Sequence, residues 1–282
     1  MKRLLFVFSI ALLLAGCGSG TQGGGGTAAS QAAPAESKGT ITVAATAVPH
    51  AEILEEAKKI LAEDGWDLQI TVFDDYVQPN LVVNDGDLDA NYFQHQPYLD
   101  QFNEENGTDL VSVGWIHYEP LGIYAGKSDD LGNIADGVSI AVPNDTTNEA
   151  RALQLLEANG IIKLKEGAGL NATKIDVIAE ESHNAEIVEL DASQVSKHAE
   201  EVDFMVLNGN YALEAGLNAA TDALAYELSD SDAAKTYVNV ITVKKGNEDN
   251  EGVKALVEVL NSDAIVQFIK DTYQGSVVYY EQ

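Results

Sequence analysis

The sequence predicts an α/β protein with two lobes, each built on its own sheet. Between residues 40 and 72 a strand pattern, an amphipathic helix pattern and a second strand pattern follow one another, which is typical of a βαβ unit. A similar succession begins again at residues 138–142. Because ligands of such proteins bind at the carboxyl ends of strands or between lobes, we expect a cleft between the two lobes.

The first unit follows from clear local signals. Residues 40–45 and 66–72 alternate apolar and polar side chains as strands do. A helix is expected to start at Pro49 and to end at Gly65, because apolar residues recur between them at helical spacing: Ile53, Leu54, Ala57, Ile60 and Leu61. Another helix is expected from Pro79. It is followed by the apolar segments 88–93 and 97–102 and by strands at 111–116 and 121–124.

The second unit opens with a strand at 138–142 and a helix at 147–159. Thr146 and Glu149 fit a capping box, and Gly160 is a typical C-terminal stop. Further strands are expected at 175–178, 204–207 and 237–243, and closing helices at 252–271. We therefore expect lobe 1 to comprise residues 39–125 and 239–282, and lobe 2 to comprise residues 126–238.

The N-terminal residues predict export and a lipid anchor. Residues 1–16 combine basic residues with an apolar run that is shorter than the ~20 residues needed to span a bilayer. Leu14-Ala-Gly-Cys17 resembles the bacterial lipobox, which implies diacylation of Cys17 and cleavage before it. Residues 17–38, rich in Gly, Ser and Ala, are expected to form a flexible linker. We therefore expect a lipid-anchored protein at the cell membrane, facing outside the cytoplasm; a plain signal peptide with an incidental cysteine is the alternative.

Composition excludes several classes of function. The net charge of −29 argues against nucleic acid or another anionic partner. Cys17 is the only cysteine, so a disulfide within the chain, a cysteine metal site and a thiol nucleophile are all excluded. The acidic surface is best interpreted as a means of staying soluble outside the cell.

Three stretches carry the candidate binding residues: 73–80, 90–99 and 142–151. The second concentrates aromatic rings, an imidazole and amides, which together provide apolar walls and polar groups that orient a ligand. Those amides need partners if they are buried. Arg151 lies in the first turns of a helix, and its planar guanidinium suits a small carboxylate.

Four motifs resemble the NlpA lipoprotein family, which comprises the methionine-binding proteins of methionine ABC importers. They match in order along the mature chain: Tyr76-Val-Gln-Pro-Asn80, Tyr92-Phe-Gln-His-Gln-Pro-Tyr98, Asn144-Asp-x-x-Asn148-x-x-Arg151 and Val206-Leu-Asn-Gly-Asn-Tyr-Ala212. The resemblance implies a periplasmic-binding-protein-like fold, with mixed, mostly parallel sheets flanked by helices and a hinged cleft. It also implies delivery of L-methionine, or a closely related amino acid, to the permease and ATPase of an ABC importer.

The resemblance also implies roles for individual residues. Arg151 would hold the ligand carboxylate, while His95 would form a hydrogen bond at the site. Asn208 and Asn239 would hold the amino and carboxylate groups. The aromatic side-chain pocket would consist of Tyr76, Phe93 and Tyr98, and Asn144 and Asn210 are further candidates. Methionine suits such a pocket because contacts between sulfur and aromatic rings are favourable.

Other functions are open alternatives. A methionine-containing dipeptide or another amino acid would suit the same family. A metal-transport lipoprotein would require histidines such as His50, His95 and His117 to converge. A structural or adhesive surface lipoprotein needs no ligand at all. An enzyme lacks support, since no Gly-x-Ser-x-Gly or His-Glu-x-x-His motif is present. We expect no catalytic residues, no cofactor and no metal.

Overall fold

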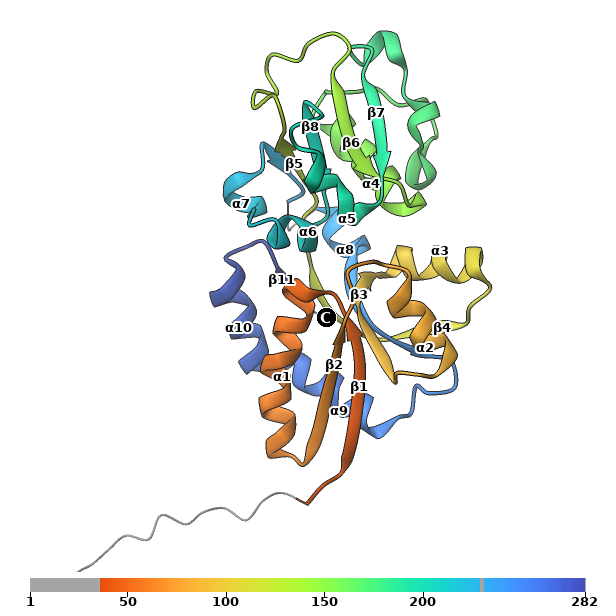
Figure 1. The fold of residues 1–282 in the computed structure, drawn as a ribbon, viewed down its shortest axis with the longest axis vertical. Helices are drawn as coiled ribbons and strands as arrows, with labels where there is room; N and C mark the ends of the chain where they lie inside the picture. Colours follow the sequence, from red (N-terminus) through yellow and green to blue (C-terminus); the bar gives the residue numbers. More distant parts are fainter. Residues whose placement is uncertain (1–35, 229–230, 282) are drawn as a thin grey trace, which may run out of the picture. The chain divides into compact units, whose positions relative to one another are not determined.

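The computed structural model describes residues 36–228 and 231–281, and they contain two sheets in two lobes (Figure 1). The sheet of lobe 1 contains, in spatial order, β11 (Val278–Tyr279), β4 (Leu110–Tyr118), β10 (Val238–Lys244), β3 (Ala90–His95), β1 (Gly39–Ala45) and β2 (Trp66–Val72). The sheet of lobe 2 contains β7 (Glu186–Leu190), β6 (Ser139–Pro143), β8 (Phe204–Leu207), β5 (Gly122–Ala125) and β9 (Ala225–Tyr226). The predicted two-lobed α/β fold is confirmed.

The predicted βαβ unit is present at the start of lobe 1. Strand β1 pairs with β2 in parallel from Gly39 opposite Trp66, and α1 (Glu52–Glu63) connects them. The apolar stripe of α1 is buried against β1 together with α9 (Glu251–Leu260) and α10 (Asp263–Tyr273). Alternate residues of β10 face opposite sides, since Ile241 belongs to this core and Val240 packs against α2 (Gln78–Asp85) and α3 (Gln96–Asn106).

Lobe 2 repeats this layered arrangement. In β8, Phe204 and Val206 face α4 (Thr146–Ala158), whereas Met205 and Leu207 face the side of α5 (Ala192–Val195) and α6 (Gly209–Glu214). Period-two alternation explains this division, because successive side chains of a strand point to opposite faces. The short helix α7 (Ala219–Asp222) contacts β9, and α8 (Asp232–Thr236) follows in the return to lobe 1, where Ala234 packs with Tyr118 and Tyr237.

The sheets are mixed, as expected, but they are not mostly parallel. Strands β1 and β6 each have two parallel neighbours. The remaining pairings, through β10, β11 and β5, are antiparallel.

Two local predictions are wrong. Residues 175–178 do not form a strand of the sheet, because Lys174–Asp176 is a 3-10 turn and β7 begins later, at Glu186. Thr146 and Glu149 do not form the capping box of α4. Asp145 caps the helix instead by accepting a hydrogen bond from the Asn148 N–H at 3.0 Å, while the Glu149 carboxylate accepts one from the Lys174 N–H at 2.8 Å.

Sheet membership also bears on the lobe boundaries. Strand β5 was expected to end lobe 1 but pairs with β8 of the lobe 2 sheet. We therefore propose that the chain first crosses at residues 119–121, between β4 and β5. We likewise propose that the chain returns to lobe 1 at the start of β10, at Val238.

Candidate functional site

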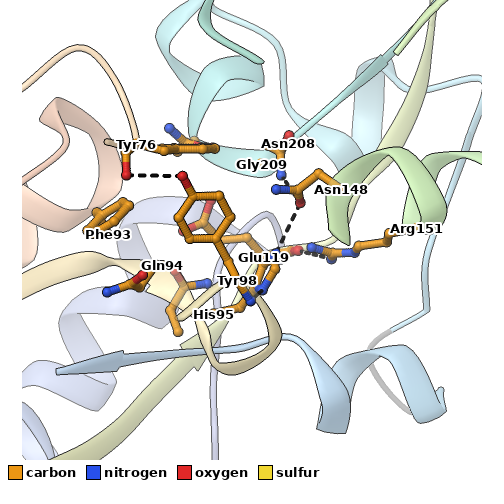
Figure 2. Close-up of a pocket in the computed structure, with 12 residues that line it drawn as sticks. Tyr76, Phe93, Gln94, His95, Tyr98, Glu119, Asn148, Arg151, Asn208 and Gly209 are labelled. Atoms are coloured by element: carbon orange, nitrogen blue, oxygen red, sulfur yellow. Dashed lines mark hydrogen bonds between the residues drawn. The ribbon is translucent and has the colours of Figure 1, made fainter. Parts of the chain in front are cut away.

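A cavity lies between side chains of the two lobes (Figure 2). The space inside it that the centre of a water-sized sphere can reach is small, about 20 Å³. The cavity is lined by Tyr76, Phe93, Gln94, His95, Tyr98, Glu119, Asn148, Arg151, Asn208, Gly209, Asn210 and Asn239. It therefore joins the end of β3 and the start of α3 in lobe 1 to α4 and α6 in lobe 2.

Aromatic rings form one wall of the cavity. The Tyr76 ring centroid lies 5.7 Å from that of Phe93 and 5.7 Å from that of Tyr98. The Tyr98 hydroxyl donates to the Tyr76 carbonyl at 3.2 Å, and Tyr211 of lobe 2 packs on Tyr76 at 5.0 Å. These contacts fix a rigid apolar surface that suits an unbranched apolar ligand chain.

An amide network forms the opposite wall, and His95 orients it. The His95 Nδ1 accepts a hydrogen bond from the Tyr98 N–H at 3.1 Å, so Nε2 carries the ring proton and donates to Asn148 Oδ1 at 3.0 Å. Burial lowers the pKa of His95 to about 3, so the ring is neutral at neutral pH. Both ring nitrogens of His95 therefore bond to protein groups, and a direct bond to the ligand stays a prediction.

The same network determines which way Asn208 points. The Asn148 Nδ2 donates to both oxygens of Asp145, at 2.9 and 3.0 Å, so its Oδ1 is an acceptor. Asn208 Nδ2 donates to that Oδ1 at 2.8 Å. The Asn208 Oδ1 is thereby turned away, and it is buried without a hydrogen-bond partner among the described residues.

Asn210 presents the complementary group. Its Oδ1 accepts a hydrogen bond from the Tyr76 hydroxyl at 2.5 Å, and its Nδ2 is buried without a hydrogen-bond partner in the described part of the chain. Unpaired buried polar atoms are costly, about 1–3 kcal/mol each. One acceptor and one donor at the same cavity indicate a ligand that carries both kinds of group.

Arg151 lines the cavity and is already paired. Its Nε and Nη2 donate to Glu227 at 2.9 and 2.5 Å, and Nη2 also donates to the Glu119 carbonyl at 2.9 Å. Its guanidinium carbon lies 4.2 Å from the centre of the Tyr237 ring, which is a cation–π distance. Burial alone would lower the pKa of Arg151 and raise that of Glu227. The ion pair outweighs burial, so the pKa of Arg151 is raised and that of Glu227 is lowered. The guanidinium is thus a fixed positive charge in the cavity wall.

Two histidines lie behind the cavity beside Glu119. His117 Nε2 lies 2.7 Å from Glu119 Oε1, and His50 Nε2 lies 3.3 Å from the same oxygen. The ligand atoms of these residues converge within 4.8 Å, as those of a metal site do. His95, expected as a third histidine in the metal alternative, bonds to Asn148 instead.

The cavity unites almost all of the predicted site. It brings together eight predicted residues: Tyr76, Phe93, His95, Tyr98, Arg151, Asn208, Asn210 and Asn239. Asn144 differs, since it is exposed and does not line the cavity.

The buried amides of β3 have hydrogen-bond partners, as expected from the sequence. Asn80 Nδ2 donates to Gln94 Oε1 at 2.9 Å, and Asn91 Nδ2 donates to Asn80 Oδ1 at 2.9 Å.

Four residues of the cavity were not predicted: Gln94, Glu119, Asn148 and Gly209. Asn148 and Gly209 belong to the motifs that indicated the site, and Gln94 lies between the predicted residues Phe93 and His95. Their closeness in sequence to predicted residues could therefore have indicated them. Glu119 had no such signal, because it is one of 45 acidic residues and precedes an ordinary strand.

Three N-terminal predictions lie outside the described residues: the signal peptide, the lipidation of Cys17 and most of the linker. A prokaryotic membrane lipoprotein lipid attachment site nevertheless matches residues 1–17. This match confirms a lipid-anchored membrane protein whose body faces outside the cytoplasm. No helix in residues 36–228 or 231–281 has the length and apolar character needed to cross a membrane.

Comparison with known proteins gives consistent results. A putative lipoprotein from Ruminococcus gnavus is 63% identical with a TM-score of 0.84, covering 86% of this chain and 99% of that one. A nutrient-binding protein from Burkholderia cenocepacia, bound to methionine, is 42% identical with a TM-score of 0.81, covering 86% and 100%. The methionine-binding lipoprotein MetQ of Bacillus subtilis is 38% identical over 282 residues, covering 99% and 97%.

The profile of the NlpA lipoprotein family matches residues 41–280, which include both sheets and every residue of the cavity. Together with these relatives, that match places the chain: it belongs to the NlpA lipoprotein family.

Proposed function

We propose that this protein binds free L-methionine in the cavity between its lobes and delivers it to the permease and ATPase of an ABC importer. The observation that carries the proposal is a pair of buried amide atoms beside Arg151, Asn208 Oδ1 and Asn210 Nδ2, which have no hydrogen-bond partner in the described ranges. An amino acid supplies a donor for the first, an acceptor for the second and a carboxylate for the guanidinium.

The aromatic wall suits the rest of the ligand. The thioether of methionine gains about 0.3–1.5 kcal/mol from each contact with an aromatic ring. Tyr76, Phe93 and Tyr98 provide three rings with centroids 5.7–6.0 Å apart. The solved Burkholderia relative contains methionine, which supports the same ligand here.

Delivery follows from the two lobes. A ligand that contacts both lobes favours the closed arrangement, because it binds that arrangement more tightly. The lipid anchor then keeps the carrier close to its importer. In this proposal the protein is a binding component and performs no chemistry on its ligand.

The test is a ligand screen on the full lipidated chain in detergent micelles. L-Methionine, D-methionine, methionine sulfoxide, other amino acids and methionine-containing dipeptides would be compared by calorimetry and thermal unfolding. L-Methionine at a hundred times its Kd should stabilise the fold by about 2.7 kcal/mol. Stabilisation by another amino acid or by a dipeptide, with none by methionine, would contradict the assignment.

A matched pair of asparagine variants tests the site itself. Asn208→Ala should weaken methionine binding about tenfold, because a buried hydrogen bond to a charged group is lost. Asn144→Ala is the control, since Asn144 belongs to the same predicted set but is exposed outside the cavity. Equal effects of the two substitutions would rule out the cavity as the binding site.

A further inference from the structure

Glu119 is a buried carboxylate in the wall of the cavity. It is 5% exposed and lies between β4 and β5, where the chain crosses between the sheets. The permanent cation in the same wall is Arg151, whose Nε and Nη2 bond to a different carboxylate, that of Glu227. Burial raises the pKa of Glu119, which reflects the cost of holding its charge away from water.

The two histidines beside Glu119 are neutral donors. The His117 Nδ1 contacts the Tyr92 hydroxyl, and the His50 Nδ1 lies 2.7 Å from the Thr46 hydroxyl. If both hydroxyls donate to Nδ1, each ring carries its proton on Nε2, which faces acceptor oxygens. Burial lowers the pKa of His50 to about 4 and that of His117 to about 3, so neither ring brings a positive charge at neutral pH.

This arrangement orients Glu119 without neutralising it. The His117 Nε2–H faces Glu119 Oε1 at 2.7 Å, whereas the His50 Nε2–H bonds to Asn239 Oδ1 at 3.0 Å and His50 Nε2 lies 3.3 Å from the same Glu119 oxygen. A carboxylate oxygen and an amide oxygen therefore both lie near His50 Nε2. Hydrogen bonds from neutral donors stabilise the ionised form of a carboxylate while leaving its charge available.

A third acceptor lines the same cavity. The Asn208 Oδ1 is buried with no hydrogen-bond partner among the described residues. The cavity is thus lined by three residues that carry acceptor oxygens. Glu119 lies in the β4–β5 connection, Asn208 directly follows β8, and Asn239 belongs to β10. A primary ammonium carries three N–H donors and no acceptor, so it matches such a set.

We propose that Glu119, held in place by His50 and His117, accepts the α-ammonium of the ligand and selects free amino acids over N-acylated ones. This inference rests on the proposed function, because it assigns a subsite within the same cavity. A peptide or N-acetyl group replaces the ammonium by a neutral amide with a single N–H. It would leave the buried carboxylate without its cation and would add bulk against an enclosed wall.

The same three side chains could instead hold a metal ion, and the geometry favours the ammonium. In the hydrogen-bonded arrangement both Nε2 atoms carry protons, which a metal would have to displace. Binding of Zn²⁺ that depends on Glu119 is the contrary outcome of the experiment.

The experiment combines a variant with a trimmed ligand. Calorimetry on the full chain in micelles would compare L-methionine with 4-(methylthio)butanoate, which keeps the carboxylate and thioether but lacks the ammonium. Glu119→Gln should weaken binding of L-methionine by roughly 10- to 100-fold and leave binding of 4-(methylthio)butanoate unchanged. Glu104→Gln, an exposed position on α3, should change neither.

The wild-type protein gives an independent result if Glu119→Gln does not fold. Removal of the ammonium, or its acetylation in N-acetyl-L-methionine, should weaken binding by a similar 10- to 100-fold factor. Three results would overturn the inference. Glu119→Gln could weaken binding of L-methionine and of 4-(methylthio)butanoate equally, or the wild type could bind these two ligands and N-acetyl-L-methionine with equal affinity. The third is binding of Zn²⁺ that Glu119→Gln removes. Failure of every methionine compound to bind would instead reject the proposed function.

Discussion

Arg151 and Glu227 form a buried bidentate ion pair, with Nε donating to Oε1 at 2.9 Å and Nη2 donating to Oε2 at 2.5 Å. The guanidinium proposed to hold the ligand carboxylate therefore already faces a carboxylate of the protein. A ligand carboxylate would join this pair as a second acceptor. The pair keeps the charge of Arg151 compensated when no ligand is bound.

Glu227→Gln should lower the stability of the ligand-free protein by about 3–5 kcal/mol, because it leaves the buried Arg151 charge without a counter-charge. Methionine should then stabilise the variant more than the wild type, since its carboxylate supplies the missing charge. Thermal unfolding with and without ligand measures both effects. Glu157→Gln, at the exposed Lys163–Glu157 pair, is the control and should change stability far less. A smaller ligand-induced shift in Glu227→Gln would show that Glu227 is needed to orient Arg151.

Gly209→Ala should weaken methionine binding about tenfold or more and lower stability by about 1–3 kcal/mol. A Cβ atom at Gly209 would lie 2.6 Å from Glu119 Cβ and 2.8 Å from Glu119 Oε2, so the carboxylate would have to move. Calorimetry and thermal unfolding measure the two effects separately. In Gly86→Ala the added Cβ meets nothing within 4 Å but the backbone has a φ of 83°, so only stability should fall. Normal binding by Gly209→Ala would mean that the position of Glu119 does not matter.

Stability should decrease as the pH falls from about 6.5 toward 4. Burial lowers the pKa of His50 to about 4 and those of His95 and His117 to about 3, so the unfolded chain takes up protons that the native protein does not. Each histidine contributes up to about 1.4 kcal/mol per pH unit in this range. The raised pKa of Glu119 acts in the opposite sense, since it favours the native state at low pH.

Urea unfolding at several pH values measures this slope. His50→Gln should reduce the slope, because one of the three contributing groups is removed. His183→Asn is the control, since His183 is exposed and has a φ of 52°, which asparagine tolerates. Identical slopes for wild type and His50→Gln would show that His50 is not neutral in the native protein.

The sequence predicted elements well where local pattern and tertiary structure agree. Strand β1, helix α1 and strand β2 follow their periodicity and their glycine stop. Strand β3 was harder to predict, because all six of its residues are buried and no alternation marks it. At the start of α4, Asp145 and Thr146 are both good caps by type, and packing decides between them, since Thr146 bonds to Glu105 instead.

The same contrast holds for the site. The aromatic wall and Arg151 stood out by residue type and by motif. Asn144 was chosen from the same motif as Asn148, yet the side chain that faces the cavity is that of Asn148. The role proposed for Glu119 depends on His50 and His117, which lie 69 and 2 residues away in the chain and converge on it in the fold.

The first crossing between the sheets has a consequence for how occupancy of the cavity is communicated. The Tyr118 hydroxyl and the Leu121 N–H, one on each side of the crossing, both donate to Glu227 Oε2, at 2.5 and 2.9 Å. That oxygen also accepts from Arg151. A ligand carboxylate that bonds to Arg151 would therefore compete with the oxygen that also holds both sides of the crossing. Binding at Arg151 would thus be felt directly at the connection between the two sheets, through the Glu227 carboxylate alone.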